Sequence, residues 1–359
     1  MNIEDFDRKN KYWTAFWEKE VLDRPLICVT APKDGHEAAY AAAKKKTFFP
    51  GLACESRDYD PFLKSFKESI DATYFGGEAM PFMNPTLGPD QYAAFLGATL
   101  EMKEEYNTSW VHSIVKDWSD FKVQLDKGPD SYFEKMRQFL DYSVKFAKGE
   151  FLVGMLDLHS NMDALSALRG PQDLCLDLMD CPEEVHRILD DVRKTYPEVF
   201  NMAYEAGAMA RTGSIGWIPC YCPTGRFAAI QCDFSYLMSP SQAREFVIPA
   251  IAEEAAMLDH CIYHYDGKEA LGHLDDILSI KEIDAIQWVP GDGQPRSIEW
   301  MDLLKKIQKA GKGLQIYDWT NQEIIDHFKD LSPEGVFFCT QAASQHEADQ
   351  LIQTIKAKM

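Results

Sequence analysis

The sequence predicts an α/β fold and, within that class, a single (β/α)8 (TIM) barrel domain spanning residues 1–359. Short apolar runs, rich in β-branched and aromatic residues, alternate with amphipathic helical segments from about residue 130 to the end of the chain. These runs are apolar along most of their length, as expected for parallel strands buried on both faces. No repeat or low-complexity tract interrupts the alternation, and α/β barrels reach this length as one domain.

The first third of the chain follows the alternation less clearly. Aromatic residues at helical spacing over residues 4–19 predict an N-terminal helical extension that covers one end of the barrel, and LICVTAP (26–32) predicts the first strand. The region from about 33 to 118 mixes polar and aromatic residues with Gly and Pro turn signals. We expect a long active-site loop there, with a second strand near 72–75 and a helix near 91–96.

From residue 130 the predicted elements follow one another regularly. Each strand is short and is followed by a helix of ordinary length. The predicted strands are 151–158, 213–219, 228–234, 261–266, 285–291, 314–319 and 336–340. The predicted helices are 130–148, 162–168, 174–179, 182–206, 241–258, 270–278, 298–310, 322–328 and 344–357.

Composition excludes several classes of partner. The formal net charge is -20, with 57 acidic and 37 basic residues, so the chain repels phosphate backbones and anionic lipid. We expect no nucleic-acid partner. No run of about 18 apolar residues and no signal peptide is present, which predicts no membrane association. Nine cysteines without disulfide spacing indicate reduced thiols and a cytoplasmic location.

Polar residues follow several predicted strands where these end. His264 and Asp266 end one strand, Gln287 the next, Asp318 another and Cys339 the last. In a (β/α)8 barrel the carboxyl ends of the strands face one mouth, so these side chains should converge in one cavity. We expect Asp233, Asp266 and Gln287 to be catalytic residues and Tyr265, Trp288 and Asp318 to contact a small-molecule substrate.

His264, Asp266 and Cys339 form a candidate zinc site. Residues i and i+2 on a strand point the same way, and a late thiolate would complete three ligands with a fourth position open for substrate. The alternatives are a hydrogen-bonded His–Asp pair at a strand end and a buried core thiol. Cys220-x-Cys222, followed by Cys232, is a weaker metal candidate because it lacks the usual spacing.

Two further polar residues have a functional and a structural interpretation. Asp233 directly precedes a predicted helix, so it is either a turn or capping acid or a carboxylate that binds a substrate nitrogen. Arg169 is either an exposed cation at a helix end or an anion clamp. The sequence leaves both choices open.

Three segments carry a resemblance to a known family. The run GMLDLHSNMDALSALRGPQDLCLDLMDCPEEVHRILDDV, then DFSYLMSPSQAREFVIP, then YHYDG with IQWVPGDG, resembles the uroporphyrinogen decarboxylase superfamily, which includes cobamide-dependent methyltransferases. The resemblance covers residues 150–358. It implies a (β/α)8 barrel and an enzyme of one of these two kinds.

Within that family the departures favour the methyltransferase branch. The decarboxylases open with an arginine-rich signature, whereas the first strand here runs LICVTAPKDG, and an early aspartate of theirs has no counterpart at residues 76–78. The methyltransferases bind zinc through His-x-Cys and a second Cys near the last strand. His264, Asp266 and Cys339 stand at the corresponding places, with Asp for Cys making the site harder.

The resemblance therefore implies a metal-assisted methyltransferase that acts with a corrinoid system on a small methylated substrate, with zinc at the site and the corrinoid carried by a partner protein. One alternative is a decarboxylase of a tetrapyrrole (porphyrin precursor) or a smaller carboxylate, in which Asp233 or Asp266 stabilises a protonated ring. Another is a non-catalytic binding partner of a corrinoid protein. Homodimer formation stays open.

Overall fold

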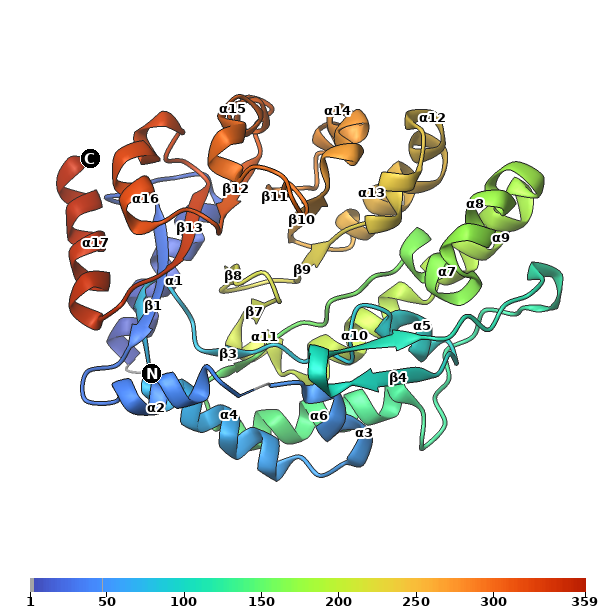
Figure 1. Cartoon of the computed structure of the whole chain (residues 1–359), viewed down its shortest axis with the longest axis horizontal. Coiled ribbons are helices and arrows are strands. Elements are labelled where there is room, and N and C mark those ends of the chain that lie inside the picture. Colours follow the sequence, from blue (N-terminus) through green and yellow to red (C-terminus); the bar gives the residue numbers. More distant parts are fainter. Residues whose placement is uncertain (1–2, 47) are drawn as a thin grey trace.

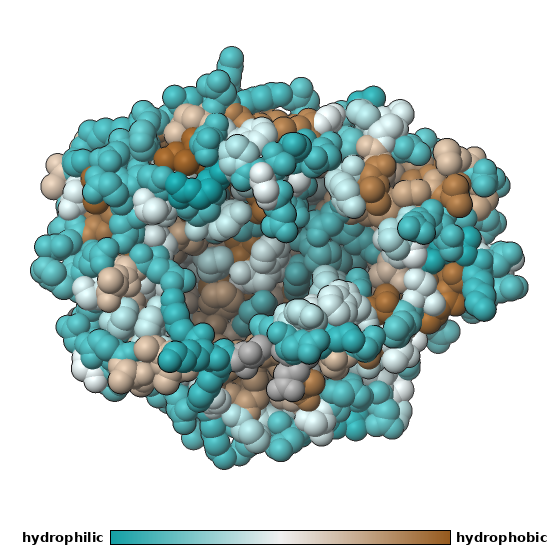
Figure 2. Space-filling model, viewed as in Figure 1, coloured by the Kyte–Doolittle hydropathy of each residue, from teal (hydrophilic) through white to brown (hydrophobic). Residues whose placement is uncertain are grey.

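A computed structural model describes residues 3–46 and 48–359. Its central element is a seven-stranded sheet in the order β2-β1-β13-β12-β11-β10-β9, in which all neighbours are parallel except the antiparallel pair β1 and β2. Figure 1 shows the strands as an arc with helices outside it, and the space-filling view in Figure 2 shows a hollow at the centre of the same face. The strands are β1 (Leu26–Pro32), β2 (Thr73–Gly77), β9 (Phe227–Ile230), β10 (His260–Asp266), β11 (Ala285–Val289), β12 (Gly313–Ile316) and β13 (Val336–Gln341).

The register of the sheet places side chains from successive strands in rows. His264 lies opposite Gln287, and Gln287 opposite Gln315, while Cys28 lies opposite Cys339. Successive side chains of a strand point to opposite faces, so each strand contributes one set to the hollow and one set to the helices. The row His264–Gln287–Gln315 and the pair Cys28–Cys339 are therefore fixed by the pairing of the strands.

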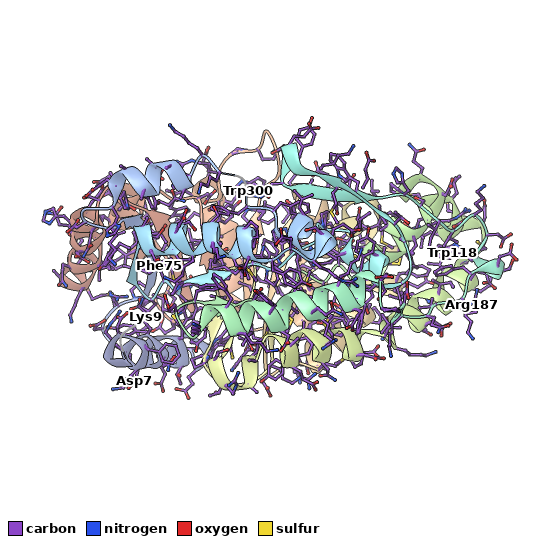
Figure 3. The ribbon with its side chains drawn as sticks, turned by 90° about the horizontal axis from the view of Figure 1, so that it is seen from below. Asp7, Lys9, Phe75, Trp118, Arg187 and Trp300 are labelled. Atoms are coloured by element: carbon purple, nitrogen blue, oxygen red, sulfur yellow. The ribbon has the colours of Figure 1, made fainter. Side chains whose placement is uncertain are left out.

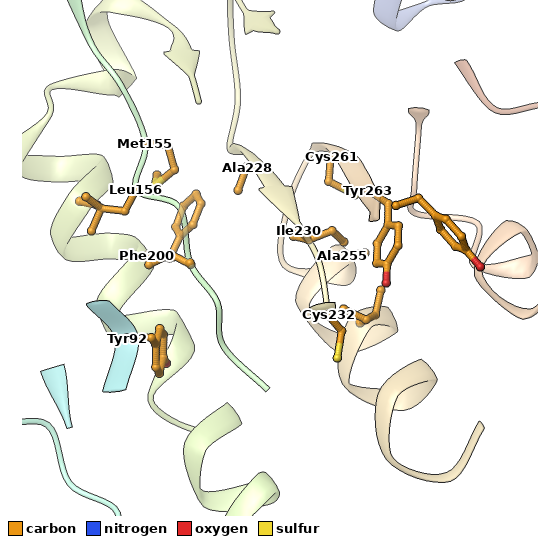
Figure 4. Packing of buried hydrophobic residues seen from close by; sticks show 14 of the residues in the cluster. Tyr92, Met155, Leu156, Phe200, Ala228, Ile230, Cys232, Ala255, Cys261 and Tyr263 are labelled. Carbon is orange, nitrogen blue, oxygen red and sulfur yellow. The ribbon is translucent and has the colours of Figure 1, made fainter. Parts of the chain in front are cut away.

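Amphipathic helices cover the outer face of the sheet. Their apolar stripes and the outward side chains of the strands form one large core, part of which appears in Figure 4 around Ile230, Cys232 and Tyr263. The helices after residue 130 are α6 (Tyr132–Ala147), α7 (Met162–Arg169), α8 (Pro171–Asp180), α9 (Pro182–Arg193), α10 (Tyr196–Ala206), α11 (Met209–Thr212), α12 (Pro240–Gln242), α13 (Ile248–Ala256), α14 (Leu274–Ser279), α15 (Met301–Lys309), α16 (Asn321–His327) and α17 (Gln345–Lys358).

Three two-stranded ladders lie beside the main sheet. The parallel pair is β3 (Phe82–Met83) with β6 (Leu152–Val153); the antiparallel pairs are β4 (Leu100–Lys103) with β5 (Thr108–Val111), and β7 (Ser214–Ile215) with β8 (Tyr221–Cys222). The α/β class is thus confirmed. Closure into an eight-stranded barrel stays a prediction, because in the described residues the ladders join seven strands into one sheet.

The region 33–118 is not the long loop that the sequence suggested. In its described residues it holds four α-helices, and the predicted strand near 72–75 and helix near 91–96 are present as β2 and α5. The longest of these helices, α4, is amphipathic and buries Leu63 and Ala72. Its Pro61 stands in the first turn, where the missing N–H would have no partner within the helix. The helices are α2 (Glu37–Ala43), α3 (Pro50–Ser56), α4 (Asp60–Ala72) and α5 (Gln91–Phe95).

Two predicted continuous elements are interrupted. The helix predicted over 182–206 breaks into α9 and α10 near Thr195, because Pro197 lacks a backbone N–H and is suited to the first turn of a new helix. The helix predicted over 241–258 contains a π turn, Ala243–Val247, between α12 and α13. Of the strand predicted over 151–158, only β6 forms a ladder.

The predicted N-terminal helix is present as α1 (Ile3–Trp17), and it lies across the amino ends of the strands. Lys9, which is almost fully buried, donates to the backbone oxygens of Phe75 (3.1 Å) and Ala79 (2.8 Å). Lys9 and Phe75 are labelled in Figure 3. Trp17 stacks on His260 at the start of β10, with ring centroids 4.4 Å apart. This end of the hollow is therefore filled by the helix.

In the described part of the chain, none of the helices combines the length and the apolar character needed to span a bilayer.

Candidate functional site

Three of the predicted residues lie together near the carboxyl end of β10: His264 and Asp266 on this strand, and Asp233 after β9. Asp233 begins a 3₁₀ turn, Asp233–Leu237, that directly follows β9, and β9 is the parallel neighbour of β10. One ligand atom each of Asp233, His264 and Asp266 lies within 4.8 Å of the others. Two carboxylates and an imidazole at this spacing can hold one divalent ion.

A second group shares Asp233 with the first. It contains His159, from the segment after β6, and Asp163, from the first turn of α7. His159 Nδ1 lies 3.4 Å from an oxygen of Asp163 and 3.8 Å from one of Asp233, and Nε2 lies 3.2 Å from an oxygen of Asp157. The two groups thus form one cluster, which we call the acidic cluster: Asp157, His159, Asp163, Asp233, His264 and Asp266.

Backbone contacts hold the acidic cluster in place. Asp163 accepts the backbone N–H groups of Asp233 (3.0 Å) and Phe234 (2.7 Å), so the start of α7 is tied to the turn after β9. This contact also explains why Asp163 is buried although it bears a carboxylate. A charged acceptor of two N–H groups contributes roughly 1.5–3 kcal/mol for each hydrogen bond.

A buried glutamate supports the same segment from behind. Glu254 of α13 accepts Ser160 Oγ (2.5 Å) and Asn161 Nδ2 (3.1 Å), while Asn161 adopts φ 60° and ψ -137°, unusual for a residue with a side chain. Asn161 Nδ2 also lies 3.1 Å from the backbone oxygen of Gln231. Glu254 therefore fixes the turn between His159 and Asp163.

Charges within the acidic cluster shift its acid–base properties. Burial acts to lower the pKa of His159, but Asp157 and Asp163 outweigh it, and the pKa is raised well above its usual value. Burial, followed by the charge of Asp163, raises the pKa of Asp233 to about 7. Burial lowers the pKa of His264. At neutral pH the cluster therefore holds a protonated His159 and a neutral His264.

A row of side chains orients His264. Gln287 Nε2 donates to Gln315 Oε1 at 2.6 Å, so Gln287 presents its oxygen to His264 Nδ1. This arrangement places the imidazole proton on Nδ1 and leaves Nε2 with a free lone pair. Trp217 packs edge-on against the ring, with centroids 4.8 Å apart. His264 is thus presented as a neutral nitrogen donor.

Gln231 contacts the His159 side of the acidic cluster. It follows β9, is 2% exposed, and its Nε2 contacts the His159 ring, 2.9 Å from Nδ1. Its Oε1 is buried and has no hydrogen-bond partner. Because a protonated His159 carries N–H groups on both ring nitrogens, the opposite orientation of the amide lets Oε1 accept from the ring and satisfies this oxygen without a ligand.

A cavity of about 350 Å³ opens beside His159, and we call it the acidic cavity. Three carboxylates and one imidazole are among the residues that line it, and several of its other residues are apolar. The lining consists of Pro89, Asp90, Val111, Ser113, His159, Asp163, Ser166, Ala167, Pro171, Asp233, Phe234, Tyr236 and Leu237.

Cys339 lies in a different cavity of about 480 Å³, which we call the thiol cavity. There it faces Cys28 across the β1–β13 pair, and the pKa of Cys28 is raised by burial and then by Cys339. Ligand atoms of His264, Asp266 and Cys339 are not all within 4.8 Å of one another. The reason is that Cys339 lies three strands from His264 and two residues further along its strand.

The thiol cavity is mainly apolar. Asp318 also lines it, but its carboxylate accepts the backbone N–H of Ser297 at 2.7 Å and thus holds a loop. Figure 2 shows the central hollow with a hydrophobic wall on the side of β1 and β13 and a hydrophilic region opposite. The lining consists of Cys28, Thr30, Phe75, Ala79, Met80, Phe82, Pro219, Tyr317, Asp318, Trp319, Thr320, Cys339, Thr340 and Gln341.

Tyr265 and Trp288 are not placed to contact a substrate in the hollow. Both are 1% exposed and belong to the core between sheet and helices, and Tyr265 donates to the backbone oxygen of Ala270. They alternate with His264 and Gln287, whose side chains face the hollow, so the pleat sends them to the opposite face. The predicted substrate-binding set is therefore corrected at these two positions.

Other sequence candidates have structural partners. Arg169 pairs with Asp177, with Nε 2.7 Å from Oδ2, and this pairing favours the structural interpretation. Cys220 and Cys222 are buried, and Cys222 Sγ donates to the backbone oxygen of Thr224. Cys232 is buried in the core behind β9.

The donors of the first group fit a divalent ion. His264 offers a neutral nitrogen, and Asp233 and Asp266 offer oxygens, which together form a harder set than the cysteine-containing one predicted from the sequence. Zinc itself stays a prediction. Sequence reasoning did not select His159, Asp163 or Gln231, although His159-x-x-x-Asp163 directly follows an apolar run that was expected to be a strand.

Comparison with known proteins gives one kind of match. No protein-family model matches the chain, and no curated protein sequence matches it. Among solved structures, the chain is similar to a methyltransferase from Methanosarcina mazei, with a TM-score of 0.63 and 13% identity over 98% of each chain. At this identity the likeness establishes a common fold.

Proposed function

We propose that the protein is a metal-assisted methyltransferase of (β/α)8-barrel type that acts on a small methylated substrate, with a corrinoid on a partner protein as methyl carrier. The observation that carries the proposal is the group Asp233, His264 and Asp266, whose donor atoms converge at the carboxyl ends of neighbouring strands. The likeness in fold to a methyltransferase supports it. The corrinoid and the closed barrel rest on the family resemblance of the sequence.

The metal would be held by His264 Nε2 and by carboxylate oxygens of Asp233 and Asp266. When bound, it would supply Lewis-acid stabilisation to a heteroatom of the donor or acceptor. Gln287 keeps the Nδ1 proton of His264 in place, so the metal-facing nitrogen stays a lone-pair donor. Asp for Cys in the His-x-Asp segment makes the site suited to oxygen and nitrogen substrates.

The residues of the chain can also manage the proton that methyl transfer requires. When a methyl group leaves a heteroatom for a nucleophile, the bonding electrons stay on the heteroatom. If that atom leaves as an anion, it needs a proton. His159 carries one at neutral pH, because its pKa is raised by Asp157 and Asp163, and it lies 3.8 Å from Asp233. We assign His159 as the general acid.

The first experiment measures metal content. Protein purified without chelator should contain about one zinc or comparable divalent ion per chain. His264→Ala should lower the content at least tenfold, because it removes the nitrogen donor. Cys339→Ser should leave the metal content unchanged, which separates the proposed ligand set from the set predicted by the sequence. His327→Ala, at an exposed histidine paired with Asp330, is the matched control.

The second experiment measures methyl transfer. Metal-loaded protein is mixed anaerobically with cob(I)alamin and, in turn, methylamines, methanol, methyl sulfides and methoxyarenes. Loss of the cob(I)alamin absorbance with formation of methylcobalamin would support the proposal, and His264→Ala should abolish it. Carbon dioxide release from uroporphyrinogen or a smaller carboxylate, without any methyl transfer, would instead identify a decarboxylase and overturn the proposal.

A further inference from the structure

We propose that the thiol cavity binds the ring of a neutral methoxyarene, an aromatic methyl ether, and that this ether is the methyl donor. The inference rests on the proposed function, because it names the substrate class of that enzyme. It is carried by three features of the cavity: aromatic side chains that are left partly exposed, a lining without basic groups, and a position in the same hollow as His264.

The walls of the thiol cavity select an aromatic ring. Phe75 of β2, Phe82 of β3 and Tyr317, directly after β12, line the cavity, and none of the three is fully buried. Tyr317 is 39% exposed. Three rings from separate elements thus leave apolar surface around one space, where an aromatic guest gains burial as well as edge-on or stacked contacts. Met80 adds a thioether, which packs favourably against a ring.

The polar part of the lining selects a neutral guest. Lysine, arginine and histidine are absent from the residues that line the cavity, so a carboxylate or phosphate on the guest would lack a counter-ion there. The one acid of the lining, Asp318, already accepts the backbone N–H of Ser297. Thr30 and Thr340 offer hydroxyl groups, which suit a phenol or a second ether oxygen on the ring.

The thiol cavity lies close to the proposed metal ligands. Pro219 lines it, and Trp217, two residues earlier, packs edge-on against His264 with ring centroids 4.8 Å apart. Tyr317 provides a second link, because its pKa is raised to about 12 by burial and Asp266 is among the charges that add to this effect. Only β11 separates β10 from β12, so these strands run about 10 Å apart, roughly the length of one substituted benzene ring. A ring in the thiol cavity can therefore extend its methoxy group towards the proposed ion.

A methoxyarene also matches the chemistry of the proposed function. Its ether oxygen has lone pairs for a divalent ion held by oxygen and nitrogen donors. In the transfer the bond between the methyl carbon and the ether oxygen breaks, and the carbon bonds to cob(I)alamin, whose cobalt supplies both electrons and becomes cobalt(III). The electrons of the broken bond stay on the oxygen, which leaves as a phenolate and takes up the proton assigned to His159. A phenolate leaves more readily than an alkoxide, because the ring delocalises its charge.

The test measures binding to metal-free, full-length protein, so it does not depend on activity. Guaiacol (2-methoxyphenol) is compared by calorimetric titration with 2-methoxycyclohexanol, which has the same substituents on a ring without π electrons. We expect guaiacol to bind more tightly on the order of tenfold, as several ring contacts imply. A third probe, 4-hydroxy-3-methoxybenzoate, adds a carboxylate and should bind about tenfold more weakly than guaiacol, because Lys44, which donates to Gln341 of the lining, is exposed to water. Equal or tighter binding of this anion would contradict the neutral class.

Alkylation locates the bound ring. Cys339 lines the thiol cavity and is partly exposed, so saturating guaiacol should slow its reaction with iodoacetamide by roughly fivefold or more. Cys175 and Cys181, on and directly after α8, are also partly exposed and lie outside this cavity. They should react at unchanged rates, and peptide mass spectrometry measures all three cysteines in one sample.

Two tyrosines give a matched pair of variants. Both are partly exposed, so both variants should fold. Tyr317→Leu keeps an apolar side chain and removes one aromatic wall, so it should weaken guaiacol binding by about fivefold and change binding of 2-methoxycyclohexanol by less than about twofold. Tyr236→Leu, at a tyrosine that lines the acidic cavity, should leave both unchanged. Weaker guaiacol binding in Tyr236→Leu alone would place the ring in the acidic cavity and overturn the proposal.

The remaining outcomes separate this inference from the proposed function. Equal binding of guaiacol and 2-methoxycyclohexanol, binding of neither, or binding that leaves Cys339 unprotected would overturn the ring site. Methyl transfer to cob(I)alamin from methanol or methylamines and not from guaiacol would overturn the donor, yet would leave the methyltransferase proposal intact. Selective guaiacol binding that protects Cys339, without transfer from any donor, would support the ring site and contradict the methyltransferase.

Discussion

The acidic cavity and the thiol cavity lie at the same ends of strands in one sheet, yet they differ in almost every chemical respect. The acidic cavity has side chains that carry charge at neutral pH and a proton-bearing His159. The thiol cavity has Cys28, whose raised pKa keeps it a protonated thiol, and Asp318, whose carboxylate accepts the backbone N–H of Ser297. Position at a strand end therefore provides access, whereas the contacts between neighbouring groups decide reactivity.

Of the substitutions that contrast the two cavities, Glu254→Ala should have the largest effect, because Glu254 supports the segment beside the acidic cavity and not the thiol cavity. The substitution removes the acceptor of Ser160 and Asn161, and we expect unfolding to become easier by about 2–3 kcal/mol and metal binding to weaken with it. Urea unfolding and metal titration measure the two effects.

Two further variants, Glu254→Gln and Glu253→Ala, are the controls for this prediction. Glu254→Gln keeps one accepting oxygen and should retain most of the stability, because the two shorter hydrogen bonds go to Oε1 and only the 3.4 Å contact of Asn161 with Oε2 is lost. Glu253→Ala, at a half-exposed residue that pairs with Arg193, should cost less than about 1 kcal/mol. Equal losses in Glu253→Ala and Glu254→Ala would contradict the supporting role of Glu254.

A smaller effect is expected from Asp233→Asn in metal-free protein. The pKa of Asp233 is raised to about 7 by burial and by Asp163, so the folded state favours the protonated acid. The stability it contributes is present at low pH and is lost as the pH rises from about 4 towards 7. The asparagine variant should lack this loss.

Thermal unfolding with chelator, from pH 5 to 8.5, measures the difference. The Tm of the variant relative to the parent should rise with pH, by on the order of 2 °C after allowance for solvent screening at this partly exposed group. A constant difference across the pH range would show that Asp233 is not coupled to its acidic neighbours.

The smallest effect should come from the thiol side. Because burial raises the pKa of Cys28, alkylation of native protein at pH 8 by iodoacetamide should leave Cys28 largely unmodified. Cys28→Ala should change stability by about 1 kcal/mol and leave the metal content unaltered. Mass spectrometry of the alkylated peptides measures the fraction of Cys28 that iodoacetamide has modified. Fast labelling of Cys28 in folded protein would show that the two cavities are less different than their contacts indicate.

Local sequence patterns predict which residues stand at the ends of strands, but not which distant residues those strands bring together. The sequence predicted that His264, Asp266 and Gln287 lie near one another because parallel strands present their carboxyl ends together. The register pairs His264 with Gln287, and Asp266 follows two residues later on the strand of His264, while their roles stay predictions. Tyr265 and Trp288 were misassigned although the two-residue period of a strand already sends them to the other face.

Cys339 and the His159 segment show where local patterns end. Separation across three strands and an offset along them depend on sheet order and register, and neither is encoded in the spacing of residues. His159 follows a run that was expected to be a full strand, but only Leu152 and Val153 form a ladder there. The turn that carries His159 is held by Glu254, about a hundred residues away in sequence, so no short sequence pattern predicts it.

Helix α1 has a consequence for the order in which ligands are added. Lys9 and Trp17 anchor it across the amino ends of the strands, and Trp13 is fully buried beneath it. Under the proposed function, a carrier protein would dock over the open end of the hollow, and a small molecule entering there would share that entrance. Once the carrier was seated, the entrance would be covered. Binding would then be compulsory in sequence, with the methyl donor first and the carrier second, and the demethylated product would leave only after the carrier departs.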